Sequence, residues 1–398
     1  MQLAKPQKYF GPKSFLACLL LIDLLLIFAI DMYLPTLPSM QKSFGVSVSY
    51  LNMTLFLFLL ISAIAVIFMG PISDRIGRKS SLVLCCVLFS VGSAGCALSP
   101  TIEWLIVFRM IEAWGMGGVI ALETVIIKDA YSGDSMNTAM TIFQSLAIIG
   151  PAIAPFLGSF MVSFFDWRAV FAFLTGAGLL SVALSCLISE TKGSITKQKS
   201  LFVDMILDSK TLLKKKSFLS LCAILGLAGI PYFAILAVIS YLCLDFFAVS
   251  YLEYCVVYLV ICLVSIIAPY VYLKANKTLS AHTILKGCFI LFGISCVSLF
   301  ILGTVSPLLM TLSLIPYLLA EGIIRPLSFV ELLDQPDYLA GTASSLSNFF
   351  YSFVTSFATV FATFEFWPNY VIGICVIMLV CLIVSLGFFA LRKAAKNN

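Results

Sequence analysis

The amino-acid sequence predicts an all-α membrane protein with twelve transmembrane helices in two pseudo-symmetric six-helix bundles. The first observation is composition, because 61% of the 398 residues are hydrophobic and only 11% are charged. Second, apolar runs of about 20 residues recur along the chain, which suits membrane-crossing helices and exceeds the roughly 10 residues of a barrel strand. Third, one long polar segment, residues 190–216, separates six apolar runs from another six.

Each predicted helix is an apolar run that ends at polar residues, glycine or proline. The first follows a basic N-terminus, and because no small-residue cleavage site comes after it, we predict a retained span. The twelve predicted spans are residues 15–37, 50–70, 81–99, 102–127, 135–161, 169–189, 217–244, 251–273, 281–303, 306–330, 338–364 and 368–391. The predicted domains are an N-terminal bundle (1–189), a basic cytoplasmic linker (190–216) and a C-terminal bundle (217–398).

Positive charge is distributed unevenly between the two sides of the predicted membrane protein. With the N-terminus inside, twenty of the 24 Lys and Arg residues face the cytoplasm, while Lys42 and Arg168 lie outside and Arg109 and Arg325 lie within helices. The positive-inside rule then places both termini in the cytoplasm. The lysines of the linker fit the same topology signal, and binding of an acidic partner is the alternative.

Several classes of chemistry have no residues to support them. The thirteen cysteines form no Cys-x-x-Cys pair and His282 is the only histidine, so we predict no metal and no cofactor. There is no Gly-x-x-x-x-Gly-Lys-Ser/Thr loop, which argues against ATP as the energy source. Six plus six helices is the architecture of transporters with two related halves. We therefore expect a small-molecule transporter in the lipid bilayer, a monomer with no nucleic-acid partner, and not an enzyme.

The first predicted helix carries two carboxylates, Asp23 and Asp31, within lipid depth. A carboxylate at the bilayer centre costs roughly 2.5–3.5 kcal/mol on insertion scales, so the pair predicts a protein-lined or water-filled cavity. At about 1.5 Å per residue, Asp31 lies about 24 Å from the cytoplasmic start of its helix, and Arg109 about 10 Å from the outer start of the fourth. In a bilayer whose hydrocarbon core is about 30 Å thick, Asp31 and Arg109 therefore approach the same depth, and Asp23 and Glu112 both fall near the middle.

These four residues predict a proton-coupling site. One arginine facing three carboxylates leaves negative charge in a low-dielectric cavity, and binding a proton relieves it. The favoured arrangement has Asp31 opposite Arg109 as the proton site, with Asp23 near Glu112 as a cargo or auxiliary site. In the alternative, Arg109 and Glu112, three residues apart on one helix, neutralise each other and only hold helices together.

Two further segments have a spacing that a plain loop or helix does not require. In the loop 70–79, two glycines permit a tight turn, an aspartate can accept hydrogen bonds from helix ends or arginine, and basic residues hold the loop in the cytosol. The loop residues concerned are Gly70, Asp74, Arg75, Gly77, Arg78 and Lys79. In the fifth helix, Pro151 and Pro155 predict a bend, and Gly150 and Gly158 predict close packing. A simple kinked helix is the alternative.

Together these segments resemble the major facilitator superfamily. The loop 70–79 is similar to its signature loop, and residues 109–118 are similar to the arginine motif of proton-coupled members, with Glu112 in place of the more usual Gln. Residues 149–158 resemble the antiporter motif of exporters. Residues 30–35 are similar to the helix 1 signature of the bicyclomycin and chloramphenicol resistance group of drug/proton antiporters, and Asp23 resembles an acid of its multidrug facilitator (MdfA-like) type.

The resemblance implies roles for these residues. The acids of helix 1 take up protons and contact cationic or neutral drugs. Asp129 pairs with Arg75 or Arg78 when the cytoplasmic side is closed. Glu123, on the same inner part of the fourth helix, faces either a cavity or packing. Aromatic side chains on the motif-bearing helices, Tyr33, Trp114 and Phe143, are candidate substrate contacts because such side chains bind many compounds.

The second half carries one candidate charge pair. Glu321 and Arg325 lie four residues apart on a predicted helix and can neutralise each other, with a substrate contact as the alternative. Taken together, the sequence predicts a proton-coupled antiporter of a bacterial inner membrane that exports drugs, with antibiotic resistance as the consequence. A dedicated transporter of one metabolite, such as a siderophore or an amino acid, is the alternative, followed by a membrane-integral sensor or enzyme.

Overall fold

A computed structural model describes residues 3, 6–146, 149–192, 209–333 and 336–397 of the chain. Helices are the only regular elements among the described residues, apart from one isolated bridge between Leu3 and Tyr131, which confirms the all-α prediction. The chain divides into two compact units, Met1–Leu201 and Phe202–Asn398. The division falls within the predicted linker, most of which, residues 193–208, lies outside the described residues.

The first unit contains the elements of the first six predicted spans. Its helices are α1 (Pro12–Asp31), η1 (Leu34–Thr36), α2 (Leu37–Phe44), α3 (Val48–Ile76), α4 (Arg78–Leu98), α5 (Ile102–Ala130), α6 (Gly133–Leu146), α7 (Ile149–Phe164) and α8 (Arg168–Leu187). The first predicted span, 15–37, is not continuous, because its α-helix ends at Asp31. A short 3-10 turn with Pro35 follows, and proline lacks the backbone N–H that an α-helix interior needs. The predicted span 135–161 corresponds to α6 and α7 together.

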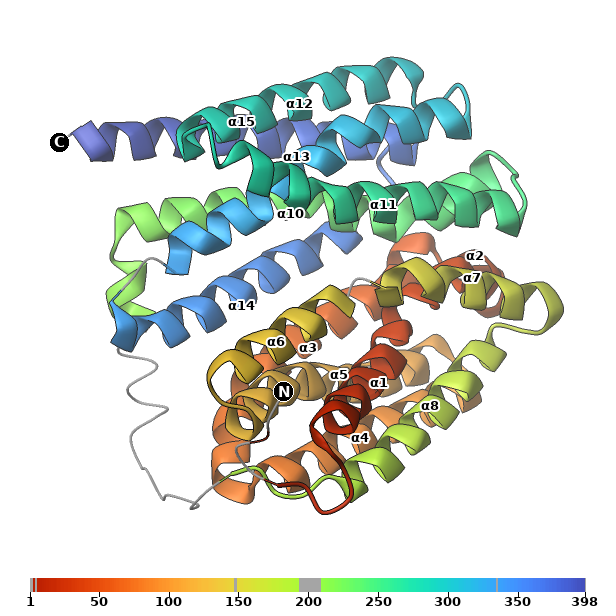
Figure 1. Ribbon diagram of the computed structural model, residues 1–398. Coiled ribbons are helices and arrows are strands. Elements are labelled where there is room, and N and C mark those ends of the chain that lie inside the picture. The colour runs from red at the N-terminus through yellow and green to blue at the C-terminus, as the bar shows by residue number, and fades with distance from the viewer. Residues whose placement is uncertain (1–2, 4–5, 147–148, 193–208, 334–335, 398) are drawn as a thin grey trace. The chain divides into compact units, whose positions relative to one another are not determined.

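Helix α5 is the element of the first unit on which the later sections depend. It packs along α3 and α4, and α8 packs against α4 and α1, while α1 also contacts α5 and α7 (Figure 1). Close approach of α4 and α5 requires a glycine, since a Cβ atom at Gly115 would lie 2.5 Å from the backbone nitrogen of Phe89. Helix α5 therefore presents its polar side chains to both α1 and α4 at short range.

The second unit contains the elements of the last six predicted spans. They are α10 (Lys216–Tyr241), the π-helical turn η2 (Leu242–Phe246), α11 (Tyr251–Ala275), α12 (Ala281–Leu302), α13 (Pro307–Leu333), α14 (Asp337–Phe361) and α15 (Tyr370–Asn397). Helix α10 packs against α13, α14 and α15, and α12 packs against α13 and α15 (Figure 1). Buried apolar side chains from α10, α13 and α14, such as Phe218 and Tyr351, form a shared core.

Ten helices of the described residues are long and apolar enough to cross a membrane. Of the two remaining predicted spans, one is divided between α6 and α7, and the other is α14. Large apolar side chains remain exposed on the spans, as Ile290, Val297 and Ile301 on α12 illustrate. Such exposure suits contact with lipid, whose hydrocarbon tails are as apolar as these side chains. The chain is thus a multi-pass membrane protein.

Candidate functional site

A buried ion pair lies at the centre of the first unit. Nη1 of Arg109 is 2.8 Å from Oε2 of Glu112, one turn away on α5, and both side chains are fully buried. The other oxygen of Glu112 accepts a hydrogen bond of 2.7 Å from the hydroxyl of Ser93 on α4. The arrangement in which Glu112 neutralises Arg109 is therefore present, which the sequence offered as an alternative.

Aromatic rings surround the guanidinium of Arg109. Its central carbon lies 3.9 Å from the ring centre of Phe58 on α3, 4.4 Å from that of Tyr33 and 5.8 Å from that of Phe171 on α8. The hydroxyl of Tyr33 is hydrogen-bonded to that of Thr54. Such faces attract a cation through the ring quadrupole, so they partly replace the water that burial removes. Tyr33, a predicted substrate contact, thus packs directly on Arg109.

Arg109 also contacts the helix that carries the first two acids. Nη1 donates a hydrogen bond of 3.2 Å to the carbonyl oxygen of Ala29 on α1, two residues before Asp31. Nε and Nη2 have no hydrogen-bond partner within the described part of the chain. Asp31, the last residue of α1, is buried. Glu112, on the same helix, forms an ion pair with Arg109, and the expected pairing of Arg109 with Asp31 stays a prediction.

Asp23 on α1 and Glu123 on α5 are both buried acids. Neither carboxyl oxygen of Glu123 has a hydrogen-bond partner in the described part of the chain. Asp23 lies eleven residues from the start of α1, about 17 Å, while Glu123 lies about 10 Å and Glu112 about 27 Å from the end of α5. Counted from the start of α1 and the end of α5, Asp23 is therefore nearer in depth to Glu123 than to Glu112, and the expected proximity of Asp23 to Glu112 stays a prediction.

The segment 70–79, predicted as a loop, consists of the end of α3, Gly77 and the start of α4, and ion pairs centred on Arg78 hold it. The guanidinium of Arg78 lies 3.0 Å from Asp129, near the C-terminal end of α5, and 2.8 Å from Asp74. Lys192, just after α8, adds a contact of 3.1 Å to Asp74. Of the two partners expected for Asp129, Arg78 makes the contact, whereas Arg75 is exposed.

Glu190 has a role in this loop that sequence reasoning missed. Its two carboxylate oxygens accept hydrogen bonds from the backbone N–H groups of Arg78 and Lys79, at 3.0 and 3.1 Å. These groups begin α4, where N–H groups lack helical partners and the helix dipole favours negative charge. Gly77 fits here because its φ is +97° and a Cβ atom would lie 2.6 Å from the glutamate. A Cβ atom at Gly70 would meet nothing within 4 Å.

The glycines of α7 bring this helix against α1. A Cβ atom at Gly158 would lie 2.5 Å from the carbonyl oxygen of Met32, and one at Gly150 would lie 2.5 Å from a methyl group of Ile27. The two contacted residues, Ile27 in α1 and Met32 just after it, flank Asp31 in the sequence. Pro155 lies inside α7, and Pro151 near its start. The segment that was expected to govern export therefore packs on the part of α1 that carries Asp31.

Two aromatic candidates lie apart from the Arg109 cluster. Trp114 is half-buried on α5, and Phe143 is buried on α6. Neither ring is among those that stack on the guanidinium, within the residues that the structure describes. Their assignment as substrate contacts stays a prediction.

In the second unit, a tyrosine lies between the residues of the predicted charge pair. The hydroxyl of Tyr351 on α14 donates a hydrogen bond of 3.1 Å to Oε1 of Glu321. The guanidinium carbon of Arg325 lies 4.9 Å from the centre of the same ring. Among the described residues no ion pair within 4 Å joins Glu321 to Arg325. Tyr351, which sequence reasoning did not single out, thus connects the two charged side chains.

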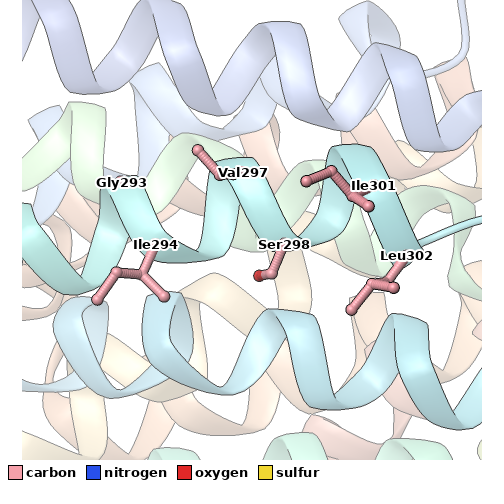
Figure 2. Close-up of a pocket in the computed structure, with 6 residues that line it drawn as sticks. All are labelled: Gly293, Ile294, Val297, Ser298, Ile301 and Leu302. Carbon is pink, nitrogen blue, oxygen red and sulfur yellow. The ribbon is translucent and has the colours of Figure 1, made fainter.

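A groove on α12 has no chemistry of this kind. It is lined by Gly293, Ile294, Val297, Ser298, Ile301 and Leu302 (Figure 2). Ser298 is the only polar residue of this lining, and its hydroxyl bonds to backbone carbonyls. We assign the groove to the apolar surface of a membrane span.

Comparison with known proteins agrees with this fold. The model of the Major Facilitator Superfamily matches residues 19–359. The uncharacterized MFS-type transporter YdgK of Bacillus subtilis (strain 168) is 25% identical over 389 residues, 96% of this chain and 96% of that protein. A chloramphenicol resistance protein of Pseudomonas aeruginosa is 32% identical over 162 residues, 40% of this chain and 38% of that protein. A solved structure of a D-xylose-proton symporter shares the fold, with a TM-score of 0.74 at 17% identity over 94% of this chain and 97% of that one.

Proposed function

This chain belongs to the Major Facilitator Superfamily, and from that premise we propose that it is a proton-coupled antiporter that exports drugs or other small amphiphilic molecules by alternating access. The similarity of 40% of the chain to a chloramphenicol resistance protein supports drugs as the cargo. The packing of Gly150 and Gly158 on α1 supports export, because it joins the antiporter-like segment to the helix with the acids. The chain is a transporter and not an enzyme.

The observation that carries the proposal is the hydrogen bond between Arg109 and the carbonyl of Ala29. It holds a buried cation at the end of α1 that carries Asp31, although the charge of that cation is matched by Glu112. Nε and Nη2 of the guanidinium, which lack partners in the described residues, are the donors available to a second carboxylate. In the cycle proposed below, these N–H groups are the donors that bind a second carboxylate.

The proposed cycle begins with a proton entering from the outside and binding to Asp31. While Asp31 is protonated, Arg109 stays with Glu112, and cargo leaves. When the proton departs to the cytoplasm, the charged carboxylate draws the free N–H groups of Arg109 and attracts a cationic or polar cargo. Proton and cargo thus compete for one state of the transporter, which is the thermodynamic requirement for exchange.

We place the protein in a bacterial inner membrane with both termini in the cytoplasm. The excess of Lys and Arg on one side of the predicted spans supports this orientation. Arg78 and Lys192, which form ion pairs with Asp74, lie on the side that this count assigns to the cytoplasm. The loop 70–79 with Asp129 then gates the cytoplasmic side, and the contact of Arg78 with Asp129 fastens the gate within the first unit.

Transport into everted membrane vesicles under an imposed pH gradient tests the proposal. The probes are chloramphenicol, a neutral drug, and tetraphenylphosphonium, a lipophilic cation. We expect gradient-driven uptake of at least one probe by the natural protein and its loss in Asp31→Asn. Glu103→Gln, which changes an exposed glutamate on the same helix as Arg109, is the control and retains uptake. Gradient-driven uptake by Asp31→Asn at the rate of the natural protein contradicts the proposal.

A further inference from the structure

Arg325 is an exposed cation inside a membrane span of the second unit. It lies eight residues before Leu333, the last residue of α13, and at about 1.5 Å per residue this places it about 12 Å from the end of the helix. Among the described residues its guanidinium forms neither a hydrogen bond nor an ion pair. A charged side chain within a span is costly in lipid and faces the protein interior or water. The cycle proposed above does not use Arg325.

The position of Arg325 around α13 shows which side it faces. At about 100° per residue, it shares a face with Tyr317 and Glu321, which are both buried. The exposed apolar side chain of Val330 lies about 140° away on the same count. The buried face packs on α10 and α14, because Tyr317 donates a hydrogen bond of 2.7 Å to a backbone carbonyl of α10 and Glu321 accepts one from Tyr351 on α14. The exposed guanidinium therefore lies on the side of these two helices, away from the apolar face.

The hydroxyl of Tyr351 holds Glu321 away from Arg325. Opposite charges four residues apart on a helix are neighbours that pair readily, yet no ion pair joins these two side chains among the described residues. Instead, Oε1 of Glu321 accepts the hydrogen bond of 3.1 Å from Tyr351. Gly229 on α10 fixes the ring of Tyr351, because a Cβ atom at this glycine would overlap the ring. The cation is thus left without the carboxylate that its own helix could provide.

Aromatic rings lie beside this cation. The guanidinium carbon of Arg325 is 4.9 Å from the ring centre of Tyr351. The ring of Phe233 on α10, which is half-buried, lies edge-on to that of Tyr351 with 6.2 Å between their centres. A guanidinium that stacks on a ring keeps its N–H groups in one plane, where two of them can bind both oxygens of a carboxylate. An aromatic group of the same ligand can pack against the rings.

We propose that Arg325 binds the carboxylate of an aromatic amphiphile and that Tyr351 and Phe233 contact its apolar part. The inference rests on the export function proposed above and deepens it, because it names aromatic carboxylates as a class of cargo. The negative charge of the ligand compensates a cation that has no acid of its own at this depth of the span. Tyr351 is also a positioning residue, since its ring orients the guanidinium and its hydroxyl keeps Glu321 from competing with the ligand.

Fluorescence titration of the purified protein in detergent tests the carboxylate site. The probes are dansylglycine and dansylglycinamide, which carry the same ring system and differ in a carboxylate against a neutral amide. We expect the natural protein to bind dansylglycine roughly ten- to a hundredfold more tightly than the amide, and Arg325→Gln to lose this preference. Lys286→Gln, which removes an exposed positive charge from α12, is the matched control and keeps the preference. An unchanged preference in Arg325→Gln overturns the inference.

A second pair of variants tests the positioning role of Tyr351. Tyr351→Phe keeps the ring but frees Glu321 to approach Arg325, so we expect the affinity for dansylglycine to fall several-fold. Tyr351→Phe with Glu321→Gln removes the competing charge and restores the affinity, while size-exclusion chromatography reports an intact fold. A tyrosine needed only for folding would not give this rescue. Failure of the double variant to recover the affinity overturns the role assigned to the hydroxyl.

Uptake of dansylglycine into everted vesicles under the imposed pH gradient tests whether the bound carboxylate is cargo. We expect gradient-driven uptake by the natural protein and its loss in Arg325→Gln. If dansylglycine binds through Arg325 but only chloramphenicol or tetraphenylphosphonium is taken up, the site holds a static ligand such as a lipid head group, and the cargo claim is overturned.

The same measurements separate the inference from the proposed function. If chloramphenicol or tetraphenylphosphonium is taken up and the titration shows no preference for the carboxylate, the proposed function stands and the inference is refuted. If the natural protein takes up none of the three probes, the proposed function fails together with the cargo claim, and an Arg325-dependent preference in the titration still supports the carboxylate site.

Discussion

Glu190 accepts hydrogen bonds from the first backbone N–H groups of α4, at Arg78 and Lys79, and so joins the end of α8 to the start of the loop-bearing helix. We predict that Glu190→Ala lowers the free energy of unfolding by about 1 kcal/mol, the usual cost of losing a helix cap. The measurement is the thermal unfolding midpoint in detergent. Glu365→Gln, an exposed acid of the second unit, is the control with an unchanged midpoint.

A double-mutant cycle sharpens this prediction. In the natural background, Gly77→Ala suffers both from the positive φ and from the clash of the new Cβ atom with Glu190. In the Glu190→Ala background only the backbone penalty remains. Gly77→Ala therefore lowers the unfolding free energy less in that background than in the natural protein. Equal costs in the two backgrounds, measured by the same midpoints, contradict the contact.

The ion pair of Arg109 with Glu112 predicts that replacing Glu112 alone strongly lowers the stability and that replacing both residues restores most of it. Glu112→Ala leaves a fully buried guanidinium without its carboxylate, which costs about 3–5 kcal/mol. Replacing both residues, as in Arg109→Met with Glu112→Leu, removes the uncompensated charge and recovers most of that loss. Ser93→Ala removes one hydrogen bond to Glu112 and costs about 1 kcal/mol.

The outcome that refutes this interpretation is a double variant as unstable as Glu112→Ala in thermal unfolding. Transport is the second measurement on this variant, because Arg109 also takes part in the proposed proton-coupled cycle. We expect the stable double variant to fold and to show no gradient-driven uptake in vesicles. This double variant therefore distinguishes the role of the ion pair in stability from the role of Arg109 in transport.

The sequence predicted the elements and their number better than the contacts between them. Long apolar runs specify membrane helices with little ambiguity, since lipid leaves the backbone few alternatives. The break after Asp31 was harder to place, because a run of apolar residues continues through Tyr33 and Leu34 and only Pro35 signals its end. Likewise, one predicted helix over 135–161 became α6 and α7.

Side-chain pairings depend on helix rotation and relative height, which residue counting gives only to within a turn. Counting from the sequence placed Asp23 at the depth of Glu112, whereas the bounds of α1 and α5 bring it nearer in depth to Glu123, a little more than three turns away along α5. The contacts of Glu190 and Tyr351 required knowledge of which helices are neighbours. For Asp129 the resemblance to a known motif left Arg75 and Arg78 as alternative partners, and the structure gives Arg78, a choice that spacing alone does not determine.

Tyr351 gives a prediction for the second unit. Its hydroxyl is the hydrogen-bond donor of Glu321, a buried acid. Tyr351→Phe leaves that carboxyl without its donor and should cost about 1–3 kcal/mol in unfolding free energy. Glu321→Leu removes the acid, and in that background Tyr351→Phe costs less. The two thermal midpoints measure this difference, and equal effects of Tyr351→Phe in both backgrounds contradict a role for the hydrogen bond.

Cys186 allows the proposed orientation to be tested with a native side chain. All thirteen cysteines lie in the described residues, and Cys186, near the end of α8, is the exposed one. In the proposed topology this end of α8 faces the cytoplasm. We predict that a membrane-impermeant maleimide labels the protein in everted vesicles and leaves it unlabelled in right-side-out vesicles. Cys186→Ser removes the labelling and identifies the site. Labelling of right-side-out vesicles through Cys186 would reverse the orientation, and with it the direction in which a pH gradient drives the exchange.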